Sequence, residues 1–218
     1  MPFALIGFFL GIKSLDRIPH VKVFEPWSLS VFSKTKLFFL GNSWIFFLVI
    51  LCMIFARSAA MAFNRWLDKN FDAKNPRTAV REIPAGVINS NNALFFVIAN
   101  CLLFIACTFF INKICFYLSP VALFVVLFYS YTKRFTALCH LVLGVGLSLA
   151  PIGAYLAVTG QFAWLPILFS FSVLFWVSGF DIIYALQDED FDKSNQLHSI
   201  PAALGKSKAL MVSNMLHV

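Results

Sequence analysis

A short acidic segment near residue 70 has the residue types and the spacing of a metal site. Asn64, Asp68 and Asp72 follow one another at intervals of four residues. Each residue of an α-helix turns the chain by about 100°, so positions i, i+4 and i+8 lie within roughly 80° of one another. The spacing therefore predicts one amide and two carboxylates on a single helical face. Such oxygen ligands suit Mg²⁺, which takes one or two carboxylates and completes its shell with water and phosphate oxygens.

A second acidic segment follows more than a hundred residues later. Asp181, Tyr184, Asp188 and Asp192 stand at offsets of 0, 3, 7 and 11, which again predicts one helical stripe. Two such stripes facing each other would repel when empty, whereas two Mg²⁺ ions with a diphosphate between them would remove the repulsion and neutralise a departing phosphate group. Acidic residues at membrane boundaries are commonly solvated caps. It is the presence of two such segments, holding eight of the ten acidic residues, that favours a functional site.

Basic residues stand where a diphosphate would need them. Arginine pairs bidentately with phosphate oxygens, and lysine offers a point charge. Three basic residues follow the first acidic segment and two lie between the acidic segments, and these five candidates are Lys74, Arg77, Arg81, Lys133 and Arg134. Arg77, Arg81 and Lys133 are the favoured ones, with charge anchoring at the membrane surface as the alternative for each.

The elements that must position these residues are membrane-spanning helices. Hydrophobic residues make up 60% of the 218 residues and charged residues 12%, whereas soluble domains have about 45–50% and about 25%. About 20 apolar residues cross a bilayer, and five such stretches are present: Leu37–Ala56, Ala93–Ile111, Ile114–Tyr131, Leu138–Val158 and Phe162–Phe180. We therefore expect an all-α, polytopic transmembrane helix bundle. Shorter apolar runs at Met1–Ile12 and Ala209–Leu216 predict a single transmembrane domain, residues 1–218, that is incomplete at both ends.

The connections between the spans differ in length and charge. Asn112–Lys113 and Thr159–Gln161 are tight turns on one face, while Asn64–Asn92, Thr132–Ala137 and Asp181–Lys208 are polar and alternate onto the other face. The three polar segments hold ten basic residues and the two turns hold one. The positive-inside rule therefore predicts an integral protein of the bacterial inner membrane with both acidic motifs on the cytoplasmic face.

Other charged and polar residues qualify this interpretation. The linker Lys13–Lys36 has five basic residues on the opposite face, which weakens the predicted orientation without reversing it. The net charge of +7 is spread over loops without a basic helix or an aromatic-basic platform, so we expect no nucleic-acid partner. The five cysteines lie in apolar stretches without paired metal-ligand spacing and are expected to be small core residues.

Histidines and glycines are expected to have structural roles. His140 and His198 have no partner at metal or catalytic-dyad spacing, so we expect structural or solvated side chains. Gly144, Gly146 and Gly153 are expected to permit close helix packing.

Together these motifs resemble the UbiA superfamily of intramembrane aromatic prenyltransferases, over nearly the whole chain. The resemblance rests on three stretches: Asn64, Asp68 and Asp72 with the following run Asn75–Gly86; the loop Tyr129–Arg134; and Asp181-x-x-Tyr184-Ala-x-x-Asp188-x-x-x-Asp192 followed by His198–Ala202. The chain is most similar to the branch labelled 4-hydroxybenzoate polyprenyltransferase, and within it to members that prenylate a dihydroxynaphthoate for menaquinone.

The resemblance implies a UbiA-type bundle of about nine spans around a central cavity, of which roughly six to seven are represented here. It implies Mg²⁺-dependent transfer of a polyprenyl group from polyprenyl diphosphate to a hydroxylated aromatic acid of the 4-hydroxybenzoate or 1,4-dihydroxy-6-naphthoate type, in ubiquinone or menaquinone biosynthesis. The metal ligands implied by motif position are Asn64, Asp68, Asp72, Asp181, Asp188 and Asp192. Arg77, Lys133 and Arg134 are implied to hold the diphosphate, and Tyr184 to lie near the reacting groups. The expected partners are the diphosphate, the aromatic acid and the lipid bilayer.

Three other functions also use clustered acidic residues. A haem O synthase-like farnesyltransferase shares the first motif but is less similar at the second. A divalent-cation transporter or channel should have acids within its spans, whereas the first four spans have none. A CDP-alcohol phosphotransferase should have a D-G-x-x-A-R run, which follows neither acidic segment.

Overall fold

The computed structural model of the chain describes residues 2–15 and 31–218, and its described residues form helices without a strand. Most of the predicted linker Lys13–Lys36, together with Asp16 and Glu25, therefore lies outside the described residues. The α-helices are α1 Pro2–Ser14, α2 Val31–Leu67, α3 Lys69–Asp72, α4 Ser90–Ile111, α5 Lys113–Thr132, α6 Cys139–Thr159, α7 Trp164–Ala185, α8 Glu189–Ser194, α9 Ile200–Leu204 and α10 Lys206–His217. A 3₁₀ turn, η2, spans Leu186–Asp188 between α7 and α8.

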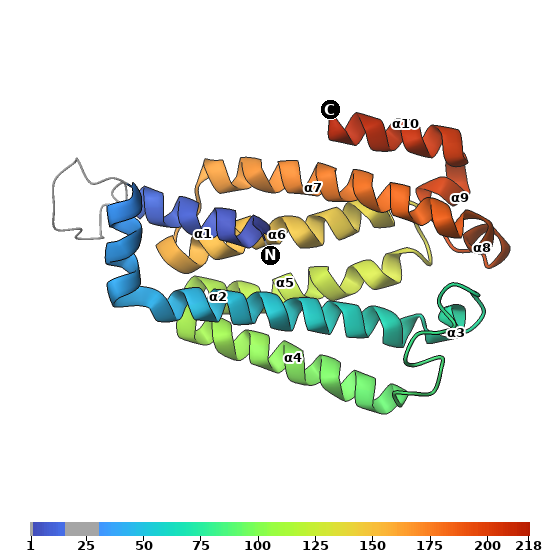
Figure 1. The fold of residues 1–218 in the computed structure, drawn as a ribbon, viewed down its shortest axis with the longest axis horizontal. Coiled ribbons are helices and arrows are strands. Elements are labelled where there is room, and N and C mark those ends of the chain that lie inside the picture. The colour runs from blue at the N-terminus through green and yellow to red at the C-terminus, as the bar shows by residue number, and fades with distance from the viewer. Residues whose placement is uncertain (1, 16–30) are drawn as a thin grey trace.

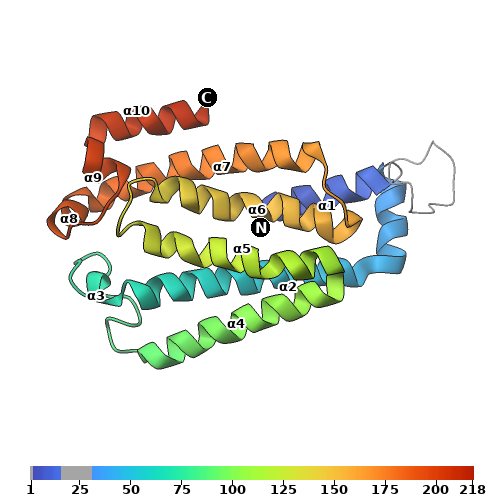
Figure 2. The same cartoon turned by 180° about the vertical axis from the view of Figure 1, so that it is seen from behind.

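Five helices are long and apolar enough to cross a membrane, which confirms the five predicted spans. They lie side by side as a bundle (Figures 1 and 2). Their bounds are Phe38–Leu67, Ser90–Ile111, Lys113–Thr132, Cys139–Thr159 and Trp164–Ser194. The first and last extend beyond the predicted apolar runs because a helix continues past the point where hydropathy falls. Both acidic motifs begin in these helical extensions.

The start of α2 differs from the polar linker that the sequence suggested. Helix α2 begins at Val31, so the last residues of the linker are helical. At Asn42 the backbone leaves helical geometry (φ −133°, ψ 24°), and the helix kinks there. Figure 1 shows the first part of α2 turned away from the long part that runs with the bundle.

Both predicted tight turns are confirmed, and each has a clear physical basis. Helices α4 and α5 are separated by Asn112 alone, whose side chain accepts a hydrogen bond from the Cys115 N–H at 2.9 Å and caps α5. The same side chain donates to the Leu156 carbonyl at 2.8 Å and so ties the turn to α6. After α6, Gly160 adopts a left-handed conformation (φ 64°), which ends the helix at low cost because glycine has no Cβ.

Close packing fixes α6 against its neighbours. A Cβ at Gly144 would lie 2.2 Å from the Ser178 hydroxyl of α7, so the close-packing prediction is confirmed there. A Cβ at Gly146 would lie 3.8 Å from Val126, an ordinary contact, and one at Gly153 would meet nothing within 4 Å. The prediction is therefore wrong for Gly153, because that position does not meet another helix.

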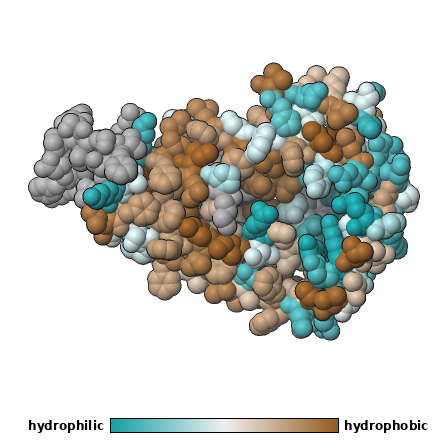
Figure 3. Space-filling model, in the orientation of Figure 1, coloured by the Kyte–Doolittle hydropathy of each residue, from teal (hydrophilic) through white to brown (hydrophobic). Residues whose placement is uncertain are grey.

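The polar segments gather at one end of the bundle. Helices α3, α8 and α9 and the loop after α3 lie together there (Figures 1 and 2). Figure 3 shows apolar side chains over the body of the bundle and hydrophilic ones at this end. The backbone N–H of His198 donates to the Lys133 carbonyl at 2.7 Å, which joins the connection after α8 to the α5–α6 loop. The predicted common face of the three polar loops is thus present.

Candidate active site

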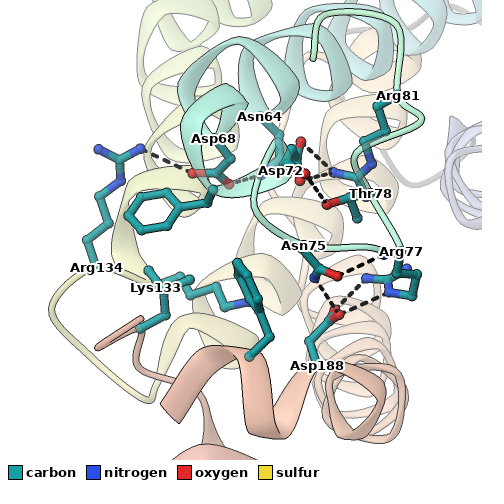
Figure 4. A pocket seen from close by; sticks show the side chains of 13 residues that line it. Asn64, Asp68, Asp72, Asn75, Arg77, Thr78, Arg81, Lys133, Arg134 and Asp188 are labelled. Carbon is teal, nitrogen blue, oxygen red and sulfur yellow. Dashed lines mark hydrogen bonds and ion pairs between the residues drawn. The ribbon is translucent and has the colours of Figure 1, made fainter. Parts of the chain in front are cut away.

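A small polar cavity of about 160 Å³ lies at this end of the bundle. Its lining comes from the end of α2, α3 and the loop that follows, the α5–α6 loop, and α8 with its flanks (Figure 4): Asn64, Asp68, Phe71, Asp72, Asn75, Arg77, Thr78, Arg81, Lys133, Arg134, Asp188, Phe191 and Leu197. Three carboxylates and four cations dominate this lining, so the cavity suits a small, multiply charged ligand.

The first acidic segment lies on one side of this cavity, as its spacing predicted. Helix α2 ends at Leu67, and Asp68 leaves helical geometry (φ −94°, ψ 8°) before α3 begins. The helical hydrogen-bond pattern nevertheless continues, because Asp68 N donates to the Asn64 carbonyl at 2.9 Å and Asp72 N to the Asp68 carbonyl at 2.8 Å. Asn64, Asp68 and Asp72 consequently all line the cavity.

Each carboxylate of this segment is bound to an arginine. Arg134 Nη2 donates to Asp68 Oδ1 at 3.1 Å, and Arg81 Nη1 lies 2.9 Å from both oxygens of Asp72. Asn64 Nδ2 donates to Asp68 Oδ2 at 3.3 Å. Burial raises the pKa of the Asp68 carboxyl above its usual value, while the Arg134 guanidinium acts in the opposite direction. Both acids of this segment are therefore paired with cations.

Asp188 joins the loop after α3 to the second acidic segment. Its Oδ1 accepts hydrogen bonds from Arg77 Nε and from Asn75 Nδ2, both at 3.0 Å, and its Oδ2 pairs with Arg77 Nη2. Thr78 Oγ1 donates to the backbone carbonyl of Asp72 at 3.2 Å and keeps the loop against α3. Sequence reasoning missed Asn75 and Thr78 because only the basic residues after the first acidic segment were given a role, although both belong to the run Asn75–Gly86 that supports the family resemblance.

The second segment does not form the single stripe that its spacing predicted, and this is a correction. Helix α7 ends at Ala185, and the 3₁₀ turn Leu186–Asp188 has about three residues per turn instead of 3.6. This change of pitch rotates the residues after α7 relative to those within it. Asp188 lines the cavity, while Asp181 does not.

The two other members of the predicted stripe also lie away from the cavity lining. Asp192 is 0% exposed in α8, and its Oδ1 lies 2.7 Å from the Lys133 ammonium. Tyr184 is 55% exposed and contacts the Phe180 ring, with centroids 6.0 Å apart. Among the predicted diphosphate ligands, Arg77, Arg81, Lys133 and Arg134 line the cavity, and Lys74 is exposed outside it.

Asp181 has a partner that the sequence did not indicate. Its Oδ2 lies 2.6 Å from Nδ1 of His140, which is buried at the start of α6. The structural role expected for His140 is thus compatible with the structure, but the pairing was missed because the two residues are 41 positions apart. His198 donates its backbone N–H to Lys133, as described above, and its side chain lines a separate cavity beside the first.

Arg57 is another residue that sequence reasoning missed. It lies within the apolar span Phe38–Leu67 and is exposed. Within the part of the chain that the structure describes, no hydrogen bond or ion pair involves its side chain. Arg57 precedes Asn64 by seven residues, so it shares the helical face of Asn64 and lies about 10 Å farther from the polar end. A charged residue at membrane depth is a recognised signal of function.

The oxygen atoms that line the cavity suit a Mg²⁺ ion that is also bound by a ligand's oxygens. The acidic and amide side chains of the cavity are hard oxygen ligands. Among the described residues, no three acidic, histidine or cysteine side chains converge closely enough to hold a metal ion by themselves. The ion would therefore have to complete its shell with water and ligand oxygens, which is how Mg²⁺ is usually bound beside phosphates.

The fold and the cavity together define a class of protein. It is a polytopic α-helical membrane protein with a charged cavity, suited to a metal-bound polyanion, at one end of its bundle. The model described as the UbiA prenyltransferase family matches residues 30–218. The chain therefore belongs to the UbiA prenyltransferase family and is an integral membrane protein.

Curated relatives share one name. The 4-hydroxybenzoate octaprenyltransferase of Tolumonas auensis is 32% identical over 157 residues, which cover 72% of this chain and 55% of that protein. The 4-hydroxybenzoate octaprenyltransferase of Francisella tularensis subsp. novicida is 31% identical over 140 residues, which cover 64% of this chain and 49% of that protein. The chain thus spans about half the length of the curated relatives it matches.

Solved structures confirm the fold. The apo structure of a UbiA homolog from Aeropyrum pernix K1 matches with a TM-score of 0.79 at 31% identity, covering 99% of this chain and 73% of that one. A UbiA homolog from Archaeoglobus fulgidus bound to DMAPP and Mg²⁺ matches with a TM-score of 0.65 at 20% identity, covering 99% of this chain and 71% of that one. The second likeness bears on the fold alone.

Proposed function

We propose that this chain transfers a polyprenyl group from polyprenyl diphosphate to a hydroxylated aromatic acid in a Mg²⁺-dependent reaction. One observation carries the proposal: the first acidic segment, Asp188 of the second and four basic residues line one small cavity at the polar end of an apolar bundle. In this position a diphosphate would lie among charges while its hydrocarbon tail lay along the membrane-embedded helices. The membership of the UbiA prenyltransferase family supports the same chemistry.

The ion pairs of the cavity suggest how the diphosphate would bind. Asp68, Asp72 and Asp188 are each paired with an arginine. The carboxylates would hold the Mg²⁺ of a metal-bound diphosphate, and the arginines would hold its phosphate oxygens. Every charge would then have a partner, so the site needs no large rearrangement to accept its ligand.

The proposed bond changes involve the donor and the acceptor. The bond between the allylic carbon and the diphosphate oxygen breaks, and the diphosphate leaves with the bonding electron pair. An electron-rich ring carbon of the acceptor then forms the new carbon–carbon bond to the allylic cation and loses its proton. Mg²⁺ supplies neutralisation of the leaving diphosphate. Cations at the cavity lining, such as Arg77 and Arg81, would hold the phosphate oxygens while the charge develops.

The acceptor is proposed to be an acid of the 4-hydroxybenzoate type. The curated relatives are named for that substrate. Arg57 supports an anionic acceptor, because it is an unpaired cation among the described residues and shares the helical face of Asn64 at membrane depth. A carboxylate there would give Arg57 a bidentate partner. The dihydroxynaphthoate type has the same carboxylate and is the alternative acceptor.

The orientation and the location belong to the same proposal. The polar end of the bundle holds the acidic motifs and most basic residues of the loops, so we place it on the cytoplasmic side of a bacterial inner membrane. Polyprenyl diphosphate would then reach the cavity from the cytoplasmic leaflet. A cation channel is less compatible with the site, because the spans before α7 have no acidic residue.

The proposal is tested by incubating the 218-residue chain in lipid nanodiscs with polyprenyl diphosphate, Mg²⁺ and either 4-hydroxybenzoate or 1,4-dihydroxy-6-naphthoate. We expect a prenylated, lipid-soluble product with at least one acceptor, and none in EDTA. Arg57→Gln is expected to raise the KM for the acceptor about tenfold, with little change in the KM for the diphosphate. If neither acceptor is prenylated by the folded chain, the proposed acceptor class is wrong.

A further inference from the structure

A second cavity lies at the polar end of the bundle, and the proposed prenyl transfer does not use it. Its volume is about 600 Å³, whereas the first cavity has about 160 Å³. Its lining comes from the α5–α6 loop, the connection between α8 and α9, and α9 itself. The buried side chain of Leu197 lines both cavities and is part of the wall between them. The second cavity thus has room for a ligand larger than a bare anion.

The polar part of this lining offers hydrogen-bond donors without a negative charge. No aspartate or glutamate among the described residues lines the cavity. Lys193 Nζ pairs with Glu189, outside the lining, at 2.6 Å, which leaves two of the three ammonium donors available. No hydrogen bond between described residues involves the imidazole of His198, which is exposed and has an N–H to donate in either protonation state. The cavity therefore suits an anion of low charge.

The backbone around Gln196 fixes this part of the cavity. Gln196 adopts a left-handed conformation (φ 56°), which is uncommon for a residue other than glycine and often occurs at ligand sites. After this residue the Leu197 N–H donates to the Asp192 carbonyl at 2.9 Å, and the His198 N–H donates to the Lys133 carbonyl at 2.7 Å. The backbone that presents the His198 side chain is therefore held on both sides of the cavity before any ligand binds.

A row of aromatic side chains continues from the cavity along α5. The ring centroids of Phe135 and Phe128 lie 6.2 Å apart, and Phe128 stacks on Phe124 at 5.3 Å. All three side chains are exposed, and α5 is one of the helices long and apolar enough to cross a membrane. A ligand with its charged group in the cavity could therefore lay a hydrocarbon chain against this row, at the boundary between membrane and water.

We propose that the second cavity binds the headgroup of an anionic phospholipid, with its phosphate held by Lys193 and His198 and an acyl chain along Phe128 and Phe124. Basic pockets between helices at the membrane surface recognise such headgroups. A phosphodiester has one negative charge and needs no metal ion, whereas a diphosphate would need a metal for which this lining has no carboxylate. The proposal does not depend on prenyl transfer, because it concerns a separate cavity.

The charge and the shape of the cavity can be changed separately. Lys193→Met and His198→Leu each remove a donor and keep the approximate size of the side chain. Lys74→Met is the matched control, because Lys74 is exposed and lines neither cavity. Ala203→Trp fills the cavity and keeps every charge, and its exposed position on α9 requires no repacking of the core. Ala203→Ser is the control for this change.

The measurement is native mass spectrometry of the 218-residue chain in detergent, titrated with phosphatidylglycerol or with phosphatidylcholine of the same acyl chains. We expect one phosphatidylglycerol molecule to bind about tenfold or more tightly than phosphatidylcholine. Lys193→Met should weaken its binding about fivefold and His198→Leu about tenfold. Ala203→Trp should remove the preference, and both controls should keep it. Phosphatidylglycerol should also raise the Tm of the wild type more than that of Ala203→Trp.

Three results would overturn the proposal. Equal affinities of the wild type for the two lipids would show that the cavity does not recognise the headgroup. A preference that persists in folded Ala203→Trp, or in the double variant of Lys193→Met and His198→Leu, would place the lipid elsewhere. Displacement of phosphatidylglycerol by an equal concentration of inorganic phosphate would show that the cavity takes a free anion. The Tm of each variant without lipid establishes that it is folded.

Discussion

The two acidic segments have similar spacing in the sequence and different surroundings in the structure. In the first segment Asn64, Asp68 and Asp72 all line one cavity, because the helical hydrogen bonds continue through the break between α2 and α3. In the second segment the 3₁₀ turn after α7 rotates the chain, and only Asp188 lines the cavity. A four-residue spacing therefore predicts a shared face only where the helix stays regular.

The second segment distributes its acids among three environments. Asp188 faces the cavity, Asp181 is bound to His140, and Asp192 is fully buried beside Lys133. All members of the first segment line the cavity, whereas the second combines one cavity residue with two acids that contact neighbouring groups. The two segments should therefore respond differently to substitution, and the expected effects can be ranked.

The largest effect is expected from removing one cavity carboxylate from each segment. Asp68→Ala and Asp188→Ala should each lower kcat/KM about 10³-fold, or about 4 kcal/mol, because each removes an oxygen ligand of the Mg²⁺-bound diphosphate. Prenyl transfer in nanodiscs measures this. Asp190→Ala is the control, because Asp190 is exposed on α8 and does not line the cavity. Equal activity of Asp188→Ala and Asp190→Ala would remove the second segment from the site.

Breaking the buried ion pair between Lys133 and Asp192 should lower the thermal stability of the protein. Lys133→Met leaves Asp192 charged and fully buried, which is expected to cost about 3 kcal/mol and lower the Tm by roughly 10 °C. Asp192→Asn should lower it less, because Lys133 is one-third exposed and can turn to water. Thermal unfolding in detergent measures both. Lys193→Met is the control, since Lys193 pairs with Glu189 on the surface. If Asp192→Asn abolishes binding of Mn²⁺, an EPR-active substitute for Mg²⁺, at an unchanged Tm, Asp192 is a metal ligand instead.

The arginines that join the segments to the ligand should affect diphosphate binding. Arg77→Gln and Arg81→Gln are each expected to raise the KM for polyprenyl diphosphate about tenfold or more, because a hydrogen bond to a charged group contributes roughly 1.5–3 kcal/mol. Arg77→Lys should restore little of this, because lysine cannot form the bidentate contact. Steady-state kinetics with varied diphosphate measure the effect. An unchanged KM in both glutamine variants would show that these arginines only neutralise the acids.

The smallest effect is expected at Lys74. The sequence placed this lysine among the diphosphate ligands, whereas its side chain is exposed outside the cavity. Lys74→Ala should therefore change the KM for the diphosphate less than about twofold, as expected for an exposed charge that makes no fixed contact. The same kinetic assay measures it alongside Arg77→Gln. A loss as large as that of Arg77→Gln would restore the role that the sequence suggested.

The fold was more predictable than the site, and the reason is physical. Membrane spans are determined by hydropathy over about 20 neighbouring residues, so the five spans and the turn at Asn112 could be predicted from local sequence. The first motif was predictable for the same reason, because the helical hydrogen bonds continue through the break at Asp68. The prediction for the second motif was wrong because it assumed a regular α-helix across Leu186–Asp188. No residue type in that stretch indicated the 3₁₀ turn.

Contacts between distant segments could not be predicted. His140 meets Asp181 because α6 packs closely on α7 through Gly144, and a single sequence does not specify that contact. Arg77 and Lys74 are equally basic and lie three residues apart, yet only Arg77 reaches Asp188, because the loop after α3 turns one side chain inward. Which of two basic side chains reaches the cavity depends on the direction of the loop backbone, and the charge of a residue does not indicate that direction.

The most direct test of the site is whether metal and diphosphate bind as a unit. Mn²⁺ binding to the 218-residue chain is measured by EPR with and without an unreactive polyprenyl thiolodiphosphate, and binding of that analogue is measured with and without Mn²⁺. Because the proposed Mg²⁺ would bind the cavity acids while the diphosphate binds the arginines paired with them, each ligand should tighten the binding of the other by the same factor, about tenfold or more. Mn²⁺ binding that is unaffected by the analogue would contradict this account.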